Sequence, residues 1–401
     1  MDEYLRRLRD GTLKLYALEK ELAPDDAVTI RRKYIEEETG VPLDRIGDCS
    51  ISLESVVKKN CENMIGTIQV PLGVAGPIRI KGEYADGMMY LPLATTEGAL
   101  IASVNRGCSL ITAAGGADVR ILKDGMTRAP VFATDSVVHA KAMCDWIRSH
   151  EPDIRAEAEA TTRFGKLTSI EMTTAGTSVF VRFSFFTGDA MGMNMVTIAS
   201  AKAADLICRE TGARLIALSG NWCTDKKPAA VNVVMGRGKT VSAGVLLSQD
   251  LISKVLKTDA SSLLEVNTRK NLVGSARAGS FGFNAHAANI VAAMFIACGQ
   301  DPAHVVEGSL CLTTVDPAPE GVYVSVTLPA LPVGTVGGGT SVETQAECLR
   351  MLGVSGSGDP PGSHARKLAE IIASGVLAGE LSLLGALAAQ HLARAHSTLG
   401  R

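Results

Sequence analysis

The chain has 401 residues, enough for two or three domains and a sizeable buried core. Its 40 basic and 42 acidic side chains nearly cancel, which argues against a nucleic-acid-binding protein. The charged N-terminus is unlike a secretory signal, and the apolar runs are too short or too interrupted to span a membrane. Nine scattered cysteines form neither a disulfide framework nor a zinc-ligand pattern, so we expect reduced thiols and a cytoplasmic location.

Four regions follow one another along the chain. Residues 1–48 carry leucines at helical spacing and predict a helical N-terminal segment. Residues 49–129 and 219–401 are rich in glycine and small residues, and we expect them to form the two parts of one large domain. Residues 130–218 predict the order β-α-β-β-α-β, which is that of a ferredoxin-like motif. The expected fold is therefore α+β, a large α/β domain with an inserted ferredoxin-like domain.

Several common signatures are absent. Gly238-Lys239-Thr240 resembles the end of a phosphate loop, but Val233 stands where that loop needs its first glycine. No Gly-x-Gly-x-x-Gly follows a predicted strand, and the histidines show no zinc-ligand spacing. Gly-x-Ser-x-Gly is missing as well. The sequence thus predicts no metal site, no standard Rossmann site and no serine hydrolase.

Two clusters of polar residues carry candidate chemistry. Glu97 is a lone carboxylate among small and apolar residues, a setting that suits a proton donor, although a helix-start carboxylate explains it more simply. Lys226 lies between Asp225 and Lys227 just before Pro228, so it belongs to a loop. A lysine held in a loop can stabilise a developing oxyanion, but a solvated turn explains the same residues equally well.

A third cluster spans residues 270–302. His286 and Asn289 are three residues apart on one predicted helix face, so they can address one ligand. Asp301 follows a long apolar run, and a turn aspartate before Pro302 is the simpler interpretation. In addition, two glycine-rich segments at 188–194 and 334–340 expose backbone amides that suit a pyrophosphate, or else form tight turns.

Together these segments resemble the class I 3-hydroxy-3-methylglutaryl-coenzyme A (HMG-CoA) reductase family from about residue 62 to residue 396. Three motifs carry most of the resemblance, in order and at consistent spacing: Glu62-Asn63-Met64-Ile65-Gly66, Asp189-Ala190-Met191-Gly192-Met193-Asn194 and Gly334–Thr340. The resemblance implies four-electron reduction of HMG-CoA to mevalonate and CoA by NADPH, through bound mevaldehyde. It also implies a homodimer or higher oligomer with its active site between subunits. The family's membrane anchor is absent from this sequence, so we expect a free catalytic portion and no membrane partner.

Residue by residue, the resemblance assigns four catalytic roles. Lys226 would stabilise the oxygen charge, Glu97 would donate a proton to the aldehyde, and Asp301 would lie between them and tune both. His396 would protonate the CoA thiolate. The implied substrate contacts are Ser103, Arg106, Arg128, Ser219, Asp225, Lys227, Lys270, His286 and Asn289. The implied NADPH contacts are Thr162, Arg163, Asp189, Met191, Gly192, Met193, Asn194, Gly337 and Gly338, with Arg163 near the 2′-phosphate.

Two other functions remain open at this point. A CoA-thioester acyltransferase or hydrolase without redox chemistry would need a nucleophile, for which Cys108 and Cys223 are candidates. A non-catalytic binding homologue of the family is the other alternative, and the presence of all four matching catalytic residues speaks against it.

Overall fold

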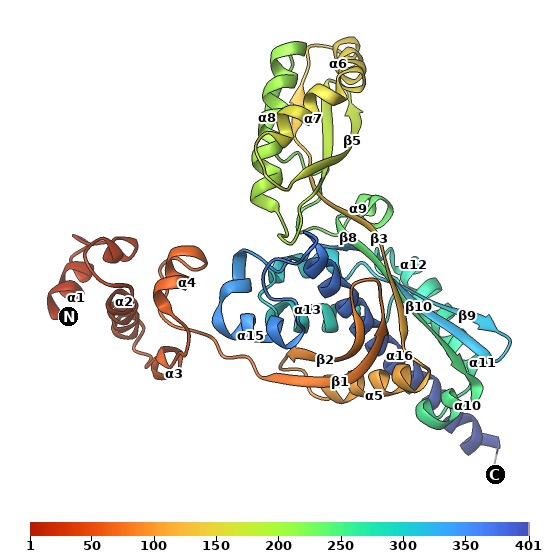
Figure 1. Cartoon of the computed structure of the whole chain (residues 1–401). Coiled ribbons are helices and arrows are strands. Elements are labelled where there is room, and N and C mark those ends of the chain that lie inside the picture. Colours follow the sequence, from red (N-terminus) through yellow and green to blue (C-terminus); the bar gives the residue numbers. More distant parts are fainter. Residues whose placement is uncertain (400–401) are drawn as a thin grey trace.

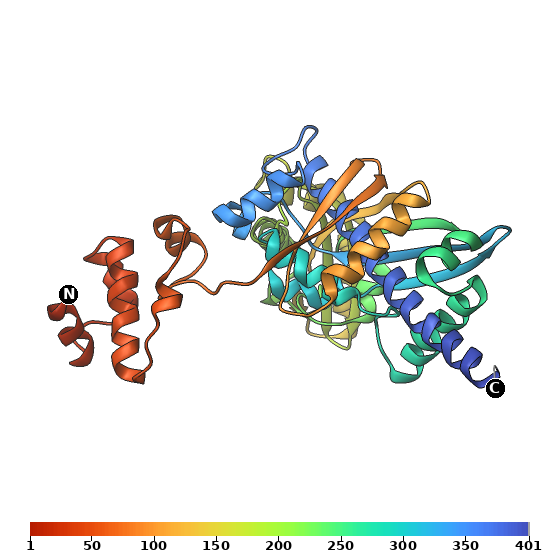
Figure 2. The ribbon, with the colours of Figure 1, turned by 90° about the horizontal axis from the view of Figure 1, so that it is seen from below.

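The computed structural model describes the backbone of residues 1–399 and the side chains of residues 1–390. Figure 1 shows a large central body, a smaller domain that stands away from it and a helical N-terminal segment on one flank. The view from below places this segment and the C-terminal end of the chain on opposite sides of the large body (Figure 2).

The N-terminal segment is a group of short helices with its own core around Leu18 and Ile30. Val56 and Met64 form a second apolar contact that reaches Val342 of the large body. The helical prediction for the beginning of the chain is confirmed. The elements are α1 (Asp2–Arg9), η1 (Leu15–Lys20), α2 (Pro24–Thr39), α3 (Asp44–Gly47) and α4 (Leu53–Lys59).

The large body is built on a sheet with the strand order β2-β1-β3-β8-β10-β9. Neighbouring strands are antiparallel, except that β1 and β3 pair in parallel over a short stretch. Most strands bury alternate side chains, as expected where one face of a sheet covers a core. The bounds are β1 (Leu72–Lys81), β2 (Asp86–Ala94), β3 (Ala117–Arg128), β8 (Gly238–Ser248), β9 (Leu312–Ala318) and β10 (Gly321–Leu331).

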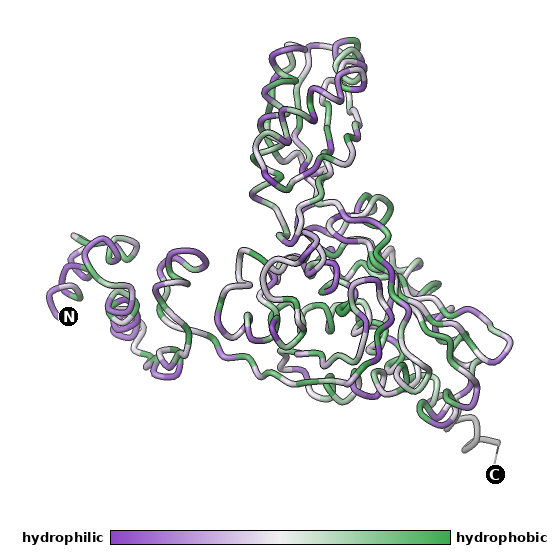
Figure 3. The backbone as a smooth tube through the Cα atoms, in the orientation of Figure 1, coloured by the Kyte–Doolittle hydropathy of each residue, from purple (hydrophilic) through white to green (hydrophobic). Residues whose placement is uncertain are grey.

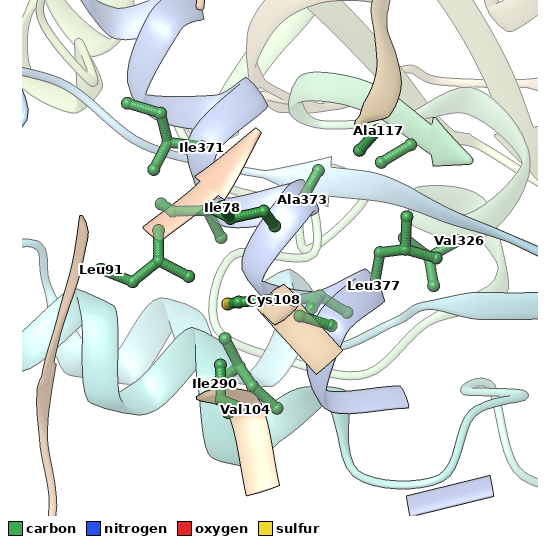
Figure 4. Packing of buried hydrophobic residues seen from close by; sticks show 14 of the residues in the cluster. Ile78, Leu91, Val104, Cys108, Ala117, Ile290, Val326, Ile371, Ala373 and Leu377 are labelled. Carbon is green, nitrogen blue, oxygen red and sulfur yellow. The ribbon is translucent and has the colours of Figure 1, made fainter. Parts of the chain in front are cut away.

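One long helix, α16 (Ser363–Leu399), crosses the large body and packs against the sheet and against helices α5 and α13 (Figures 1 and 2). Ile78, Leu91, Val104 and Ile290 surround it in the main core (Figure 4). By length and composition this helix is apolar enough to cross a membrane, but its most apolar window is 83% buried inside the protein, as in a core helix.

The other helical elements of the large body connect its strands, and several of them pack against the sheet or against α16. They are α5 (Leu100–Ala113), α9 (Ala230–Met235), α10 (Gln249–Leu251), η2 (Ile252–Leu256), α11 (Ala260–Val266), η3 (Asn267–Gly274), α12 (Ser275–Ala278), α13 (Ala287–Ala297), η4 (Pro302–His304), α14 (Val305–Gly308), η5 (Gly338–Ser341) and α15 (Glu343–Met351).

Glycine makes the close packing of α16 feasible. A Cβ atom on Gly107 of α5 would lie 1.9 Å from the carbonyl oxygen of Ala378, so the two helix backbones touch. On the other side, a Cβ on Gly379 would lie 2.5 Å from Ile290 of α13. These two glycines therefore serve close packing inside the core.

The smaller domain confirms the ferredoxin-like prediction. Its strand order is β5-β6-β4-β7, all antiparallel, and α6 and α7 pack against α8. Helix α7 is an addition that the sequence did not predict. Strand β3 extends from the large sheet and pairs with β6, which joins the two bodies. The bounds are β4 (Val131–Ala133), α6 (Val137–Ser149), α7 (Glu151–Glu159), β5 (Lys166–Ala175), β6 (Ser178–Phe186), α8 (Met193–Thr211) and β7 (Arg214–Ala217).

The two bodies have separate apolar cores. Phe132, Phe183 and Phe185 centre the core of the small domain, which shares no buried member with the core around α16. The hydropathy of the backbone trace shows hydrophobic stretches inside both bodies and long hydrophilic stretches on the N-terminal helices (Figure 3).

Candidate active site

Lys226 lies on a strained loop between β7 and α9. Asn221, Thr224 and Lys226 adopt φ angles of 63°, 44° and 56°, a region that non-glycine residues rarely occupy. Contacts from outside the loop hold this conformation, since the Lys226 amide donates to Glu307 at 3.2 Å and the Asn232 side chain donates to the Thr224 carbonyl. Strain maintained in this way is typical of functional sites.

Lys226 pairs with Asp301. Its Nζ atom lies 2.7 Å from Oδ2 of Asp301, whose Oδ1 accepts from the Ala303 amide. The hydrogen bond to Asp301 raises the pKa of Lys226. Burial alone would raise the pKa of Asp301, but the bonds from Lys226 and Ala303 and the nearby His304 ring outweigh it and lower that pKa. Both groups are therefore charged at neutral pH.

Below this pair lies a network of buried ionic groups. Nη1 of Arg237 donates to Oε1 of Glu307 at 2.6 Å, and Nη2 donates to Oδ1 of Asp225 at 3.0 Å. Nδ1 of His304 contacts the same Glu307 oxygen at 2.8 Å. Arg237 and Glu307 are fully buried, and a buried ion needs its partners to remain charged. The network thus forms a rigid base for the Lys226 loop.

Asp225, His304 and Glu307 also place ligand-type atoms within 4.8 Å of one another, as a metal site would. The guanidinium of Arg237 bonds both carboxylates, however, and supplies the positive charge that a cation would bring. The three side chains therefore surround the Arg237 guanidinium. The absence of a metal stays a prediction.

Glu97 lies on the loop between β2 and α5 and faces a different group of side chains. Asn289 donates to its Oε1 at 3.2 Å. The Nε2 atom of His286 donates to the Gly379 carbonyl at 2.8 Å, which leaves Nδ1 to accept from Asn289 at 3.3 Å. Helix α5 begins at Ala99 without a side-chain cap, so the simpler interpretation of Glu97 as a helix cap is wrong.

The buried carboxylate of Glu380 supports this second group from α16. It accepts hydrogen bonds from the amides of Ala285 and His286 and from the Thr313 hydroxyl, each at 2.7 Å. These bonds fix the start of α13, and with it the positions of His286 and Asn289.

The two groups lie at opposite ends of α13. Asn289 is in its first turn, Asp301 comes four residues after its last residue, and the 11-residue helix between the two groups is roughly 16 Å long. Asp301 bonds Lys226, and within the described part of one chain no contact joins it to Glu97. The prediction that Asp301 lies between Glu97 and Lys226 is therefore not met inside a single chain.

Some side chains of the predicted substrate contacts are exposed to solvent, and others bond residues inside the protein. Lys227 is exposed, and Nη1 of the partly buried Arg128 lies 3.8 Å from Oδ2 of Asp225. Ser219 contacts Cys223, and the exposed Lys270 donates to Asn271. Ser103 and Arg106 instead bond Ser382 of α16. These last two side chains are engaged in joining α5 to α16.

The two predicted cofactor segments meet, although almost 150 residues separate them. The amide of Thr335 donates to the Asp189 carbonyl at 2.7 Å, and Ala190 forms a bridge with Val336. Gly337 and Gly338 have φ angles of 79° and 57° and open space where side chains would be. Their backbone is therefore exposed beside the beginning of α8.

Other predicted cofactor residues have varied surroundings. The Asp189 carboxylate is buried and accepts from the amides of Gly358, Gly362 and Ala365, so it holds the beginning of α16. Arg163 is exposed at the end of the small domain's α7–β5 connection. The remaining members are Thr162, which contacts Met195, the half-buried Met191 and Met193, the exposed Asn194, and Gly192 before α8. The His396 side chain lies outside the described residues.

Comparison with known proteins identifies the family. The family model for hydroxymethylglutaryl-coenzyme A reductase matches residues 27–401. The chain belongs to this family. A relative from Methanothermobacter thermautotrophicus, named 3-hydroxy-3-methylglutaryl-coenzyme A reductase, is 55% identical over 98% of both chains. One of the same name from Methanocaldococcus jannaschii is 53% identical over 100% of this chain and 99% of its own.

Solved reductases share the fold. A class II 3-hydroxy-3-methylglutaryl-CoA reductase from Streptococcus pneumoniae, bound to NADPH in open conformations, superimposes with a TM-score of 0.67 at 20% identity. The match covers 89% of this chain and 86% of that chain. The family is thus established, whereas the resemblance to class I in particular is not confirmed.

The acyl-transfer alternative loses support at its proposed nucleophiles. Cys108 is fully buried, and burial raises the pKa of its thiol to about 12. Burial also acts to raise the pKa of the enclosed Cys223, although hydrogen bonds from Ser219 and the backbone lower it overall. A thiol without solvent access is a poor nucleophile. All nine cysteines are free, as the sequence predicts.

The sequence analysis missed Arg237, His304, Glu307 and Glu380. Arg237 stands between two glycines directly before a strand, and His304 and Glu307 are three residues apart, which are the available signals. Neither pattern indicates that the side chains are buried.

Proposed function

We propose that this chain catalyses the reduction of HMG-CoA to mevalonate and CoA, with NADPH as the source of both hydrides. The observation that carries this proposal is the Lys226–Asp301 pair on its strained loop, in a chain of the reductase family. Lys226 is 44% exposed, so its ammonium group is available to a substrate carbonyl oxygen. There it stabilises the negative charge that develops when a hydride arrives.

The joined glycine segments fit NADPH. The 19-residue helix α8 starts at Gly192 without a side-chain cap, so its first amides are available to a pyrophosphate. Gly337 and Gly338 present bare backbone beside it, and Arg163 suits a 2′-phosphate. NADPH would supply hydride, while the chain's residues bind and orient it.

A matched pair of glycine variants tests the cofactor segment. Gly338 and Gly176 have similar φ angles, 57° and 60°, and open space at the Cβ position, but Gly176 lies in the remote β5–β6 turn. Alanine at either position should cost about 1 kcal/mol of stability through backbone strain. Only Gly338→Ala should raise KM for NADPH, and an equal rise in Gly176→Ala would contradict this assignment.

Acid–base roles follow from position and from the resemblance. Glu97 donates a proton at the aldehyde step, with Asn289 orienting its carboxylate. Asp225, Arg128, Lys227 and Ser219 form a polar region for the acyl group. His396 protonates the departing thiolate; this role and the class I assignment come from the resemblance alone. The cytoplasmic location rests on the nine free thiols and the charged N-terminus.

We also propose that two chains share each active site. Glu97 and Lys226 lie on groups separated by the length of α13, and a second copy can bring the Glu97 group of one chain to the Lys226 group of the other. An apolar surface suited to association is exposed on the β1–β2 hairpin and the segment before it, at Ile68, Leu72, Val74, Met88 and Tyr90.

Hybrid oligomers decide whether the site is shared. Co-expression of Glu97→Ala and Lys226→Ala chains should restore about a quarter of wild-type activity, because half of random dimers are mixed and one of their two sites is intact. No recovery would place both residues in a site within one chain.

The reaction itself is tested by following NADPH and NADH oxidation with HMG-CoA while titrating released thiol. Two cofactors oxidised per thiol are expected, and faster oxidation of NADPH would support the role of Arg163. Thiol release without cofactor oxidation would indicate acyl transfer and refute the reductase proposal.

A further inference from the structure

His304 is a buried imidazole to which the proposed reaction assigns no role. Its ring is 1% exposed and lies next to the Lys226–Asp301 pair, at the end of η4. Nδ1 lies 2.8 Å from Oε1 of Glu307. Because an ionised carboxylate only accepts hydrogen bonds, Nδ1 carries a proton in this contact.

Among the described residues, the second ring nitrogen of His304 has no hydrogen-bond partner. Nε2 is buried without a hydrogen bond, and Oδ2 of Asp301 lies 3.7 Å from it, beyond hydrogen-bond distance. The same oxygen is 2.7 Å from Nζ of Lys226. With a neutral ring, Nε2 would turn a lone pair toward a carboxylate, and both atoms would be acceptors. With a second proton, Nε2 becomes a charged donor aimed at Asp301.

Charged groups from several elements surround the ring and its neighbour. Nη1 of Arg237 and Oδ1 of Asp225 lie 3.4 and 3.8 Å from Nδ1 of His304. The group includes three carboxylates and three cations: Asp225, Asp301, Glu307, Arg128, Arg237 and Lys226. With a neutral His304 ring, these charges balance only while Lys226 remains at the site, and a second proton on the ring replaces the charge that leaves with Lys226. Lys226 is also the exposed member, the one that can turn toward a substrate.

We propose that the doubly protonated His304 is a positioning residue, which donates its Nε2–H to Asp301 when Lys226 turns toward the substrate carbonyl oxygen. Glu307 holds the ring from the opposite side through Nδ1. No covalent bond changes, because one hydrogen bond to Oδ2 of Asp301 replaces another. The inference rests on the proposed reductase function, since the substrate oxygen is what draws Lys226 away.

The pH dependence of kcat follows from this exchange. A pH high enough to remove the Nε2 proton deprives Asp301 of its replacement partner, and kcat should fall. A His304→Gln variant offers an amide donor that does not titrate, so it should retain turnover and lose this alkaline decrease. His304→Ala offers no donor at any pH, so it should lower kcat about tenfold below the alkaline decrease, with little change in KM, and the difference from wild type should shrink as the pH rises through that decrease.

The test compares kcat profiles of the full-length wild type, His304→Gln, His304→Ala and the control His150→Gln, which lies in the small domain outside the site. NMR follows the histidine ring signals of the wild type against pH in the presence of HMG-CoA. The His304 signal is assigned as the one that is missing from the spectrum of His304→Gln. We expect the His304 ring signal and the alkaline decrease in kcat to change over the same pH range. The control His150→Gln should show the wild-type kcat profile.

The proposal would be overturned if His304→Gln kept the alkaline decrease in kcat that the wild type shows. It would also be overturned if the NMR signal of the His304 ring did not change over the pH range of that decrease. If His304→Ala does not fold, the glutamine variant and the NMR titration still decide. If the wild type oxidised no NADPH at any pH, the proposed reductase function itself would be refuted. If the wild type were active but its alkaline decrease in kcat did not depend on His304, only the role of His304 would be refuted.

Discussion

The two ends of α13 are constructed differently. At its C-terminal end, Lys226 and Asp301 stand on a buried network centred on Arg237 and Glu307. At its N-terminal end, Glu97 is an exposed side chain held by one 3.2 Å bond from Asn289. The first group is preorganised by its own chain, whereas the second offers its carboxylate to solvent. A reactant or a second chain must therefore contribute more of the contacts that fix the catalytic geometry at the Glu97 end than at the Lys226 end.

Replacing Lys226 with alanine should have the largest catalytic effect. Without its ammonium group the charge that develops on the substrate oxygen loses its proposed stabilising partner, and kcat should fall by about 10²–10³-fold. Stability should change little, because the Lys226–Asp301 pair is half exposed. Steady-state NADPH oxidation and thermal unfolding measure the two effects. A loss below tenfold would show that the preorganised end does not carry the chemistry.

Replacing Glu307 with leucine tests the rigidity of the same end. The change leaves the buried Arg237 and His304 without a shared acceptor, and should lower the free energy of unfolding by about 3–5 kcal/mol. Denaturant unfolding measures the loss. The double variant Glu307→Leu/Arg237→Met removes both charges and should recover part of it. A loss below 1 kcal/mol in the single variant would mean that the network is not a rigid base.

Changing Asn289 tests the opposite, loosely held end. Asn289→Ala removes the long hydrogen bonds to Glu97 and to Nδ1 of His286, so it should leave stability nearly unchanged and slow mevaldehyde reduction by about 3- to 10-fold. Asn289→Asp places a carboxylate against Glu97 and should slow the same step further, because like charges repel. Turnover with mevaldehyde as the substrate isolates this step. Equal rates in both variants would contradict an orienting role.

The sequence predicts the fold well where the pattern is local. Alternating residues near 167–186 and the helical spacing of 136–150 indicate the ferredoxin-like order, and the apolar run after 364 indicates α16. Helix α7 is not predicted because its buried face consists only of Ile154 and Ala158, too few apolar residues to mark a helix in the sequence. Its addition does not alter the strand order, so the predicted topology holds.

The site is harder to predict because its geometry depends on contacts between distant segments. Sequence motifs identify Lys226 and Glu97 singly, but only the packing of α13 shows that they lie at opposite ends of a helix. Burial of Arg237 likewise requires ion pairs with Asp225, which precedes it in the sequence, and with Glu307, which follows it. No local pattern distinguishes such an arginine from an exposed one between two glycines.

The smallest expected effect concerns stability against pH at the Lys226 end. The pKa of Asp301 is lowered in the folded protein, so its ionisation stabilises the fold above its ordinary value of about 3.9, and this contribution disappears as the pH falls through the lowered pKa. Asp301→Asn should therefore lower the unfolding temperature slightly at pH 7, and the difference from wild type should shrink toward pH 3. The effect should stay below about 1 kcal/mol because the pair is partly exposed.

Asp205→Asn is the matched control, because Asp205 is exposed in the middle of α8 with no recorded ion pair among the described residues. Its unfolding temperature should follow that of wild type at every pH. If Asp301→Asn behaves in the same way, the Lys226–Asp301 pair contributes nothing measurable to the fold. The rigidity of that end would then come from the buried network alone, with the pair free to rearrange around a substrate.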